Sequence, residues 1–181
     1  MPFVNYDSLN QNYPSGYMNE NMNLLKDFDK FHCLLACNTE RAASVKNRVI
    51  NLPDEYLKWL NVCDGGILFD TTMLTTKSHD DTLNLDFFTY GNFFKEEIRQ
   101  KIKLSENWFI FAFAVHDDVF FFDTDIKDGR VYQWDIEEHN IYAFWESFED
   151  WLSDQIHEGI GLIADELLYP VGIKLEVSEN E

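Results

Sequence analysis

The residues whose types and spacing could bind a metal ion lie in the segment 123–129. This segment holds three aspartates, and hard cations such as Ca²⁺ prefer several carboxylate oxygens. An EF-hand loop would also need acidic side chains at two positions that are Lys127 and Trp134 in this chain. Because Asp128-Gly129 strongly favours a hairpin turn, we expect an ordinary acidic hairpin loop here and no metal site.

Cysteine and histidine could form a second kind of site. Cys33 and Cys37 are spaced one helical turn apart, with His32 beside them, so two thiolates could share one face. A structural zinc site usually has four ligands, and the other histidines are scattered along the chain. We therefore interpret these cysteines, and Cys63, as buried apolar side chains. The odd number of cysteines and the absence of a secretory segment favour the cytoplasm.

Motifs that activate a nucleophile or a water molecule are absent. The sequence contains no Gly-Lys-Ser/Thr phosphate loop, no Gly-x-Ser-x-Gly elbow, no His-Glu-x-x-His helix and no Gly-x-Gly-x-x-Gly turn. Carboxylate pairs are numerous, but with 33 Asp and Glu among 181 residues chance supplies them. We predict that the protein is not an enzyme and needs no cofactor.

The negative charge is unevenly placed along the chain. The net charge is −19, and residues 1–51 contain equal numbers of acidic and basic side chains, so the whole excess lies in residues 52–181. Such a field repels nucleic-acid phosphates and anionic lipid headgroups, and it speeds encounter with basic proteins. We therefore predict a basic protein partner, without direct nucleic-acid or membrane binding. No segment approaches the ~20 apolar residues that span a bilayer.

The candidate partner-binding site is a group of carboxylates with two aromatic side chains between them. Its members are Asp117, Asp118, Asp123, Asp125, Tyr132, Trp134, Asp135, Glu137 and Glu138. An aromatic anchor within an acidic rim is typical of a protein-binding patch. A solvated surface that aids solubility explains the carboxylates equally well. Trp134 suits the core as well as it suits a surface anchor.

The elements that must position these residues follow from hydrophobic spacing. Pro53 suits the first turn of a helix, Tyr56, Trp59 and Leu60 form its buried stripe, and Gly65-Gly66 supplies a left-handed exit. Ser147 should cap a second helix, whose inward stripe runs from Phe148 to Leu167 and which could break near Gly159 and Gly161. The eight apolar residues at 108–115 predict a strand covered on both faces near the centre of a sheet.

The remaining elements are predicted by periodicity and turn residues. Further helices are expected over 22–37, from 38–39 through 49, and over 94–102. Further strands are expected over 67–69, 82–89, 119–122, 130–134 and 171–177. Residues 1–20 show no sustained period and are expected to be a loosely held, flexible arm.

The pattern from Leu52 to Gly66, read with Trp108–Ala114, Gly129–Trp134 and Ser147–Leu152, resembles the SUKH superfamily. These Smi/Knr-type proteins include many bacterial toxin-neutralising immunity proteins. The resemblance implies a single α+β domain over 21–181, with a central, mainly antiparallel twisted sheet flanked by helices. It also implies function by protein binding. We expect an immunity protein that neutralises a toxin, possibly a nuclease, through an acidic surface; the alternative is a regulatory interaction scaffold.

Overall fold

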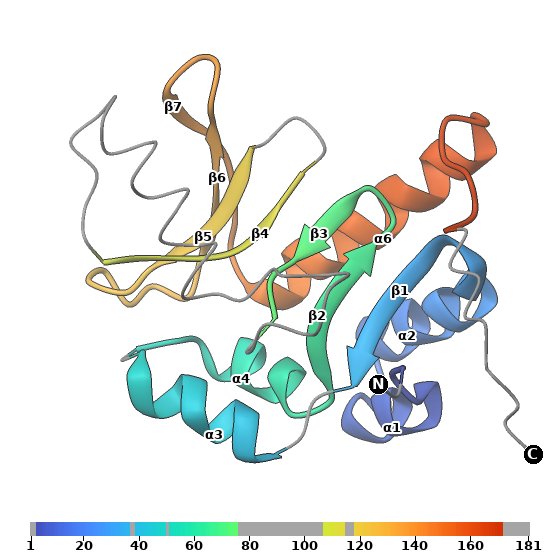
Figure 1. Ribbon diagram of the computed structural model, residues 1–181, viewed down its shortest axis with the longest axis horizontal. Coiled ribbons are helices and arrows are strands. Elements are labelled where there is room, and N and C mark those ends of the chain that lie inside the picture. The colour runs from blue at the N-terminus through green and yellow to red at the C-terminus, as the bar shows by residue number, and fades with distance from the viewer. Residues whose placement is uncertain (1–2, 37–38, 50, 76–106, 115–117, 172–181) are drawn as a thin grey trace, which may run out of the picture.

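In the part of the chain that the structure describes, seven antiparallel strands form one sheet, and helices pack on it. The computed structural model describes residues 3–36, 39–49, 51–75, 107–114 and 118–171 (Figure 1). The strands follow one another across a single sheet in chain order: β1 (His32–Ala36), β2 (Cys63–Leu68), β3 (Thr71–Met73), β4 (Trp108–Phe113), β5 (Val119–Asp123), β6 (Val131–Asp135) and β7 (Asn140–Trp145). The described helices are α1 (Tyr6–Asn12), α2 (Tyr17–Asp27), α3 (Thr39–Arg48), α4 (Asp54–Leu60) and α6 (Phe148–Ala164), with a 3₁₀ turn at Asp29–Phe31. The predicted α+β fold with an antiparallel sheet is confirmed.

The most apolar strands lie at the centre of the sheet. β4 pairs with β3 on one side and with β5 on the other, and Phe109 stands opposite Phe122 in this central pair. The first five residues of β4 and the first four of β5 are buried. Consecutive buried residues on a strand mean that both of its faces are covered. The prediction of a central strand beginning at Trp108 is therefore confirmed through Phe113, while residue 115 lies outside the described residues, and the strands expected at 119–122 and 130–134 are confirmed as β5 and β6.

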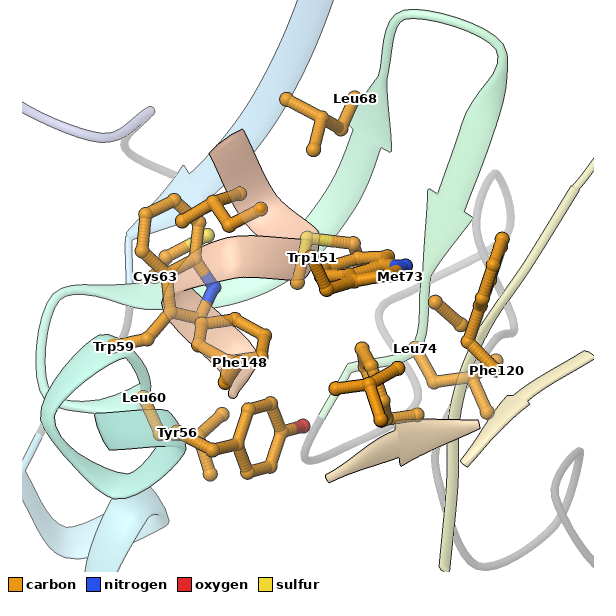
Figure 2. Packing of buried hydrophobic residues seen from close by; sticks show 14 of the residues in the cluster. Tyr56, Trp59, Leu60, Cys63, Leu68, Met73, Leu74, Phe120, Phe148 and Trp151 are labelled. Atoms are coloured by element: carbon orange, nitrogen blue, oxygen red, sulfur yellow. The ribbon is translucent and has the colours of Figure 1, made fainter. Parts of the chain in front are cut away.

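Helix α6 covers one face of this sheet (Figure 1). Its N-cap is Ser147, whose Oγ accepts a hydrogen bond from the backbone N–H of Asp150 at 3.0 Å, as predicted. Phe148 and Trp151 are fully buried and reach from α6 into the core (Figure 2). The ring of Trp151 meets that of Phe111 edge to face, with centroids 4.9 Å apart. The aromatic stripe of the helix therefore attaches it to the central strands.

The shorter helix α4 completes the same aromatic core. Tyr56, Trp59 and Leu60 are buried, which confirms the predicted stripe (Figure 2). The ring centroid of Tyr56 lies 5.0 Å from those of both Phe122 and Phe148, so one tyrosine contacts the sheet and α6 together. Tilted and edge-to-face aromatic pairs at this spacing add to the stability that burial alone provides.

Gly65 and Gly66 play a different part from the one predicted. They lie inside β2 instead of in a turn that leaves α4. Their φ angles are 97° and 121°. A Cβ on Gly65 would stand 2.4 Å from the carbonyl oxygen of Leu74, and one on Gly66 would stand 2.1 Å from that of Cys33. The glycines are therefore needed because neighbouring backbone approaches β2 too closely for any side chain.

The helix predicted over 22–37 is wrong in its second half. Helix α2 ends at Asp27, and the chain from His32 onward is β1, which pairs with β2. His32 to Leu35 are all buried. A short apolar run does not by itself distinguish a buried strand from a buried helix, and here pairing with β2 selects the strand. Cys33 is consequently a buried strand residue, while Cys37 lies outside the described residues.

The loosely held arm predicted for residues 1–20 is also wrong where the structure describes it. Asn5 caps α1 by accepting a hydrogen bond from the N–H of Asp7, and Leu9, Tyr13 and Met18 are buried in the core. These three buried residues are distributed over α1, the connection after it and α2, so they do not repeat at one helical period, and no pattern in the sequence indicated the two helices. The last helix also differs from expectation, because α6 continues through both of its glycines.

Several other predicted elements have clear outcomes. The helix expected through residue 49 is confirmed as α3, whereas β3 and β7 were not predicted. The strand expected at 82–89, the helix at 94–102 and, except for Val171, the strand at 171–177 lie outside the described residues.

Candidate protein-binding surface

The predicted binding residues lie at two ends of the β5–β6–β7 meander. Asp123 ends β5 and Asp125 follows it in the connection to β6; we call residues 123–130 the lower acidic loop. Asp135 ends β6, and Glu137 and Glu138 follow it in the connection to β7; we call residues 135–139 the upper acidic loop. Because β5 has five residues at about 3.4 Å each, roughly 17 Å separates the two loops. The carboxylates therefore form two groups instead of one rim.

At the upper acidic loop, Asp118 is part of the framework. Its carboxylate accepts hydrogen bonds from the backbone N–H of Ile136 at 3.3 Å and from the side-chain amide of Gln133 at 3.0 Å. Asp135 accepts from the backbone N–H of Glu138 at 2.8 Å. These bonds fix the loop and leave Glu137 and Glu138 exposed on it. Asp117 lies outside the described residues.

At the lower acidic loop, the carboxylates bind their own backbone. Asp123 accepts a hydrogen bond from the N–H of Asp125 at 3.0 Å, and Asp128 accepts one from the N–H of Arg130 at 3.0 Å. Asp128 also accepts from the Tyr132 hydroxyl at 2.6 Å. Burial and this carboxylate raise the pKa of Tyr132. Among the described residues, no three His, Cys, Asp or Glu side chains are placed to hold a metal ion.

Trp134 belongs to the core. Its side chain is only 6% exposed, and its ring centroid lies 5.5 Å from that of Trp108. The sequence left open whether Trp134 is a core residue or a surface anchor. The structure places it in the core, where a partner does not contact it directly. Tyr132 remains half-buried, stacked on Phe121 at a centroid distance of 5.5 Å.

The exposed aromatic surface lies on β7, which the sequence interpretation missed. Ile141, Tyr142 and Phe144 are 47%, 71% and 53% exposed. Large apolar side chains exposed together are uncommon away from interaction sites. The segment could have been recognised as a strand, since every residue from Ile141 to Trp145 except Ala143 is β-branched or aromatic, directly after the polar turn at 137–140. Its exposure could not, because exposure depends on the position of β7 at the sheet edge.

Neighbouring side chains hold Phe144 in place. The guanidinium of Arg130 lies over its ring at 5.0 Å and forms two hydrogen bonds with the Glu146 carboxylate, at 2.9 and 3.2 Å. The ring of Tyr132 lies 6.4 Å away on the adjacent strand. The Glu146 carboxylate raises the pKa of Arg130, so the stacked guanidinium stays charged. An aromatic side chain ordered before binding loses less conformational entropy when a partner covers it.

A hollow of about 390 Å³ lies beside the end of β7. Its lining residues come from α2, β7 and the outer side of α6: Tyr17, Trp145, Asp150, Ser153, Asp154 and His157. The indole N–H of Trp145 donates to the Asp154 carboxylate at 2.9 Å. Two carboxylates with exposed aromatic surface are chemically suited to a cationic side chain.

A second cavity, of about 270 Å³, lies beside β1 and brings Tyr6, His32 and Cys33 together. Nε2 of His32 lies 2.7 Å from the carbonyl oxygen of Leu25 and donates to it. Burial lowers the pKa of His32 and raises that of Cys33. An activated cysteine needs the opposite shifts, an imidazolium beside a thiolate. The geometry supports a structural role for these residues.

A comparison with family models decides the relationship of this chain to known proteins. The model of the SMI1 / KNR4 family (SUKH-1) matches residues 43–154. The chain belongs to this family. The match confirms the predicted membership of the SUKH superfamily. Searches among curated proteins and solved structures found no match.

The SMI1/KNR4 match covers the candidate surface. It begins within α3, includes β2 to β7, and ends within α6, so both acidic loops and the exposed side of β7 fall inside it. Helices α1 and α2 and strand β1 precede the matched region. Within the part of the chain that the structure describes, every helix is too short or too polar to cross a bilayer.

Proposed function

We propose that this SMI1/KNR4-family protein is an immunity protein, a non-enzymatic domain that neutralises a basic toxin by covering its surface. The observation that carries the proposal is the exposed aromatic strand β7 between two acidic loops. Family membership supports a role in protein binding, since SUKH proteins include many immunity proteins. The net charge of −19 supports a basic partner.

A nuclease toxin fits this chemistry best. Such an enzyme needs Lys and Arg side chains to bind the phosphates of its substrate. A carboxylate-rich surface attracts the same side chains and speeds association. Once bound, it would exclude the nucleic acid from the substrate-binding groove of the toxin. The aromatic side chains of β7 would then provide the apolar contact area that slows dissociation of such a complex.

A regulatory interaction scaffold is the second candidate. The described residues before position 43 add two helices and a strand to the region that the family model matches. This additional surface offers a place for further partners, which a scaffold requires. The two candidates differ in one respect that can be measured, because a scaffold does not protect cells from a toxin.

The test begins with affinity capture from the native host at low and high salt, followed by expression of each captured protein in cells with and without this chain. We expect one captured basic protein to stop growth and this chain to restore it. Binding without restored growth would favour the scaffold.

Charge variants test the acidic surface in the same complex. Glu137→Gln with Glu138→Gln removes two charges from the upper acidic loop, whereas Asp165→Asn with Glu166→Gln removes two charges from the far end of α6 (Figure 1). Asp118 is avoided because it supports the loop. We expect the first pair to slow association several-fold at low salt and to flatten its salt dependence, with little change for the second pair. Equal effects of the two pairs would contradict the proposed surface.

A further inference from the structure

The geometry points to β7 as an open sheet edge to which a partner adds an extended, basic segment as an eighth strand. This inference rests on the proposed function and specifies how the partner is bound. Among the described residues, β7 pairs with β6 alone. An edge strand presents unpaired N–H and C=O groups along its outer side, which makes it a template for another strand.

The opposite edge of the sheet shows what a covered edge looks like in this protein. Beside β1, the backbone N–H of Val4 donates to the carbonyl oxygen of Leu34 at 3.0 Å, and Phe3 bridges to Leu35. The N–H of Val171 donates to the carbonyl oxygen of Lys30 just before β1. The chain itself thus pairs with one edge. In Figure 1, β7 lies on the other side of the molecule from these contacts.

β7 also lacks most devices that keep edge strands unpaired. Its six residues include neither Lys nor Pro, which natural proteins use to block such edges. A bulge interrupts the register between Ile141 and Ala143, on the side of the upper acidic loop. Beyond it, Ala143, Phe144 and Trp145 pair regularly with β6, so this half of the strand is a suitable template.

The side chains of β7 suit a strand that contacts both faces of the sheet edge. Phe144 lies on the face that carries Tyr132, and its ring is already ordered by Arg130. Trp145 lies on the α6 side, where its ring meets Phe120 at 5.8 Å. An added strand would place alternate side chains on these two faces. Apolar residues would cover Phe144 on one face, and residues on the other would pass over the hollow beside Trp145.

Charge identifies the occupant as basic. Glu137 and Glu138 stand at one end of β7, and the hollow with Asp150 and Asp154 stands at the other. A second copy of this chain would bring two such ends together, each on a molecule of net charge −19, so self-pairing is opposed. Lys or Arg on an added strand would instead meet carboxylates at both ends, and one in the hollow would also lie against Trp145.

The test uses synthetic peptides of alternating valine and lysine with the full-length chain at low salt. The acidic control has glutamate in place of lysine. A second control keeps the lysines but carries proline in place of valine, so it has the same charge and cannot form a strand. We expect only the valine–lysine peptide to bind saturably and to slow amide hydrogen exchange along β7.

Two variants localise the binding. Phe144→Ser should weaken binding of the valine–lysine peptide about tenfold or more, as loss of a central aromatic anchor does. Leu167→Ser, beyond the end of α6 and 68% exposed, is the matched control and should bind normally. The inference would be overturned if the proline peptide bound as tightly as the valine–lysine peptide, or if amide exchange along β7 were unchanged at saturation. It would also be overturned if both variants lost the same amount of binding. Protection of β7 that grows with protein concentration without peptide would overturn it in favour of a second copy.

Growth protection by the chain, read together with hydrogen exchange of β7, separates this inference from the proposed function. If the chain restores growth while exchange of β7 amides is unchanged in the captured complex, strand addition is refuted and the immunity role stands. If the valine–lysine peptide binds at β7 but no toxin is neutralised, the immunity role fails and the edge remains a binding site.

Discussion

Two glycines in α6 provide a sharp test of the core packing, because the same substitution should have clearly different effects on stability at positions 159 and 161. Gly159 is buried against Phe69, whereas a Cβ at Gly161 would meet no atom within 4 Å outside its own helix and chain neighbours. Alanine is favoured over glycine inside a helix by about 1 kcal/mol. Gly161→Ala should therefore raise the free energy of unfolding by up to about 1 kcal/mol.

At position 159 the gain in helix propensity is opposed by steric overlap between the added Cβ and the side chain of Phe69. A Cβ there would stand 2.2 Å from Cγ of Phe69 and 2.6 Å from its Cβ, where ordinary contact begins at 3.4 Å. Rotation of the ring cannot relieve the overlap, since Cβ of Phe69 is itself involved and His32 packs against the ring at a centroid distance of 5.7 Å. Overpacking of this kind costs about 1–3 kcal/mol.

The difference between the two variants isolates this cost, because both share the gain in helix propensity. Gly159→Ala should unfold with a free energy about 1–3 kcal/mol below that of Gly161→Ala, measured by urea denaturation with far-UV circular dichroism. In thermal unfolding, a chain of this size should show midpoints that differ by about 2–12 °C. Equal stability of the two variants, or a more stable Gly159→Ala, would refute the close packing of α6 against Phe69.

Two further predictions concern capping and charge. Ser147→Ala should lower the free energy of unfolding by about 1 kcal/mol, because it removes the N-cap of α6, while Ser147→Thr should restore most of the loss; urea unfolding measures both. Burial, with Asp70 and Asp154 nearby, raises the pKa of Glu158, so the ionised side chain disfavours the folded state. Glu158→Gln should therefore be the more stable protein near neutral pH, and its advantage should disappear as the pH falls below 4.5, the ordinary pKa of the group. A pH-independent difference between Glu158→Gln and the wild type would contradict this reasoning.

The sequence predicted the elements whose information is local. Tyr56, Trp59 and Leu60 repeat at helical spacing, and the Ser147 cap is complete within four residues, so α4 and the start of α6 were recognised without knowledge of their neighbours. The apolar run at 108–115 likewise predicted a central strand, because an uninterrupted run needs cover on both faces.

The candidate site was predicted less completely. The sequence identified the acidic loops by composition, but the hydrogen bond between Gln133 and Asp118 joins residues that only the folded meander brings together. Trp134 and Phe144 are similar side chains on adjacent strands, yet one is buried and the other is exposed. Their difference depends on which strand stands at the edge of the sheet, and no local pattern contains that information.

The sequence by itself determined the fold class, the family and the acidic character of this protein, because periodicity, helix caps and charge are properties of short segments. The tertiary structure determined that His32–Ala36 is a strand, that Gly65 and Gly66 admit neighbouring backbone, and that the exposed aromatic surface lies on β7. The physical reason is the same in each case. Strand pairing, close backbone approach and exposure are set by residues far away in the chain, which only folding brings into contact.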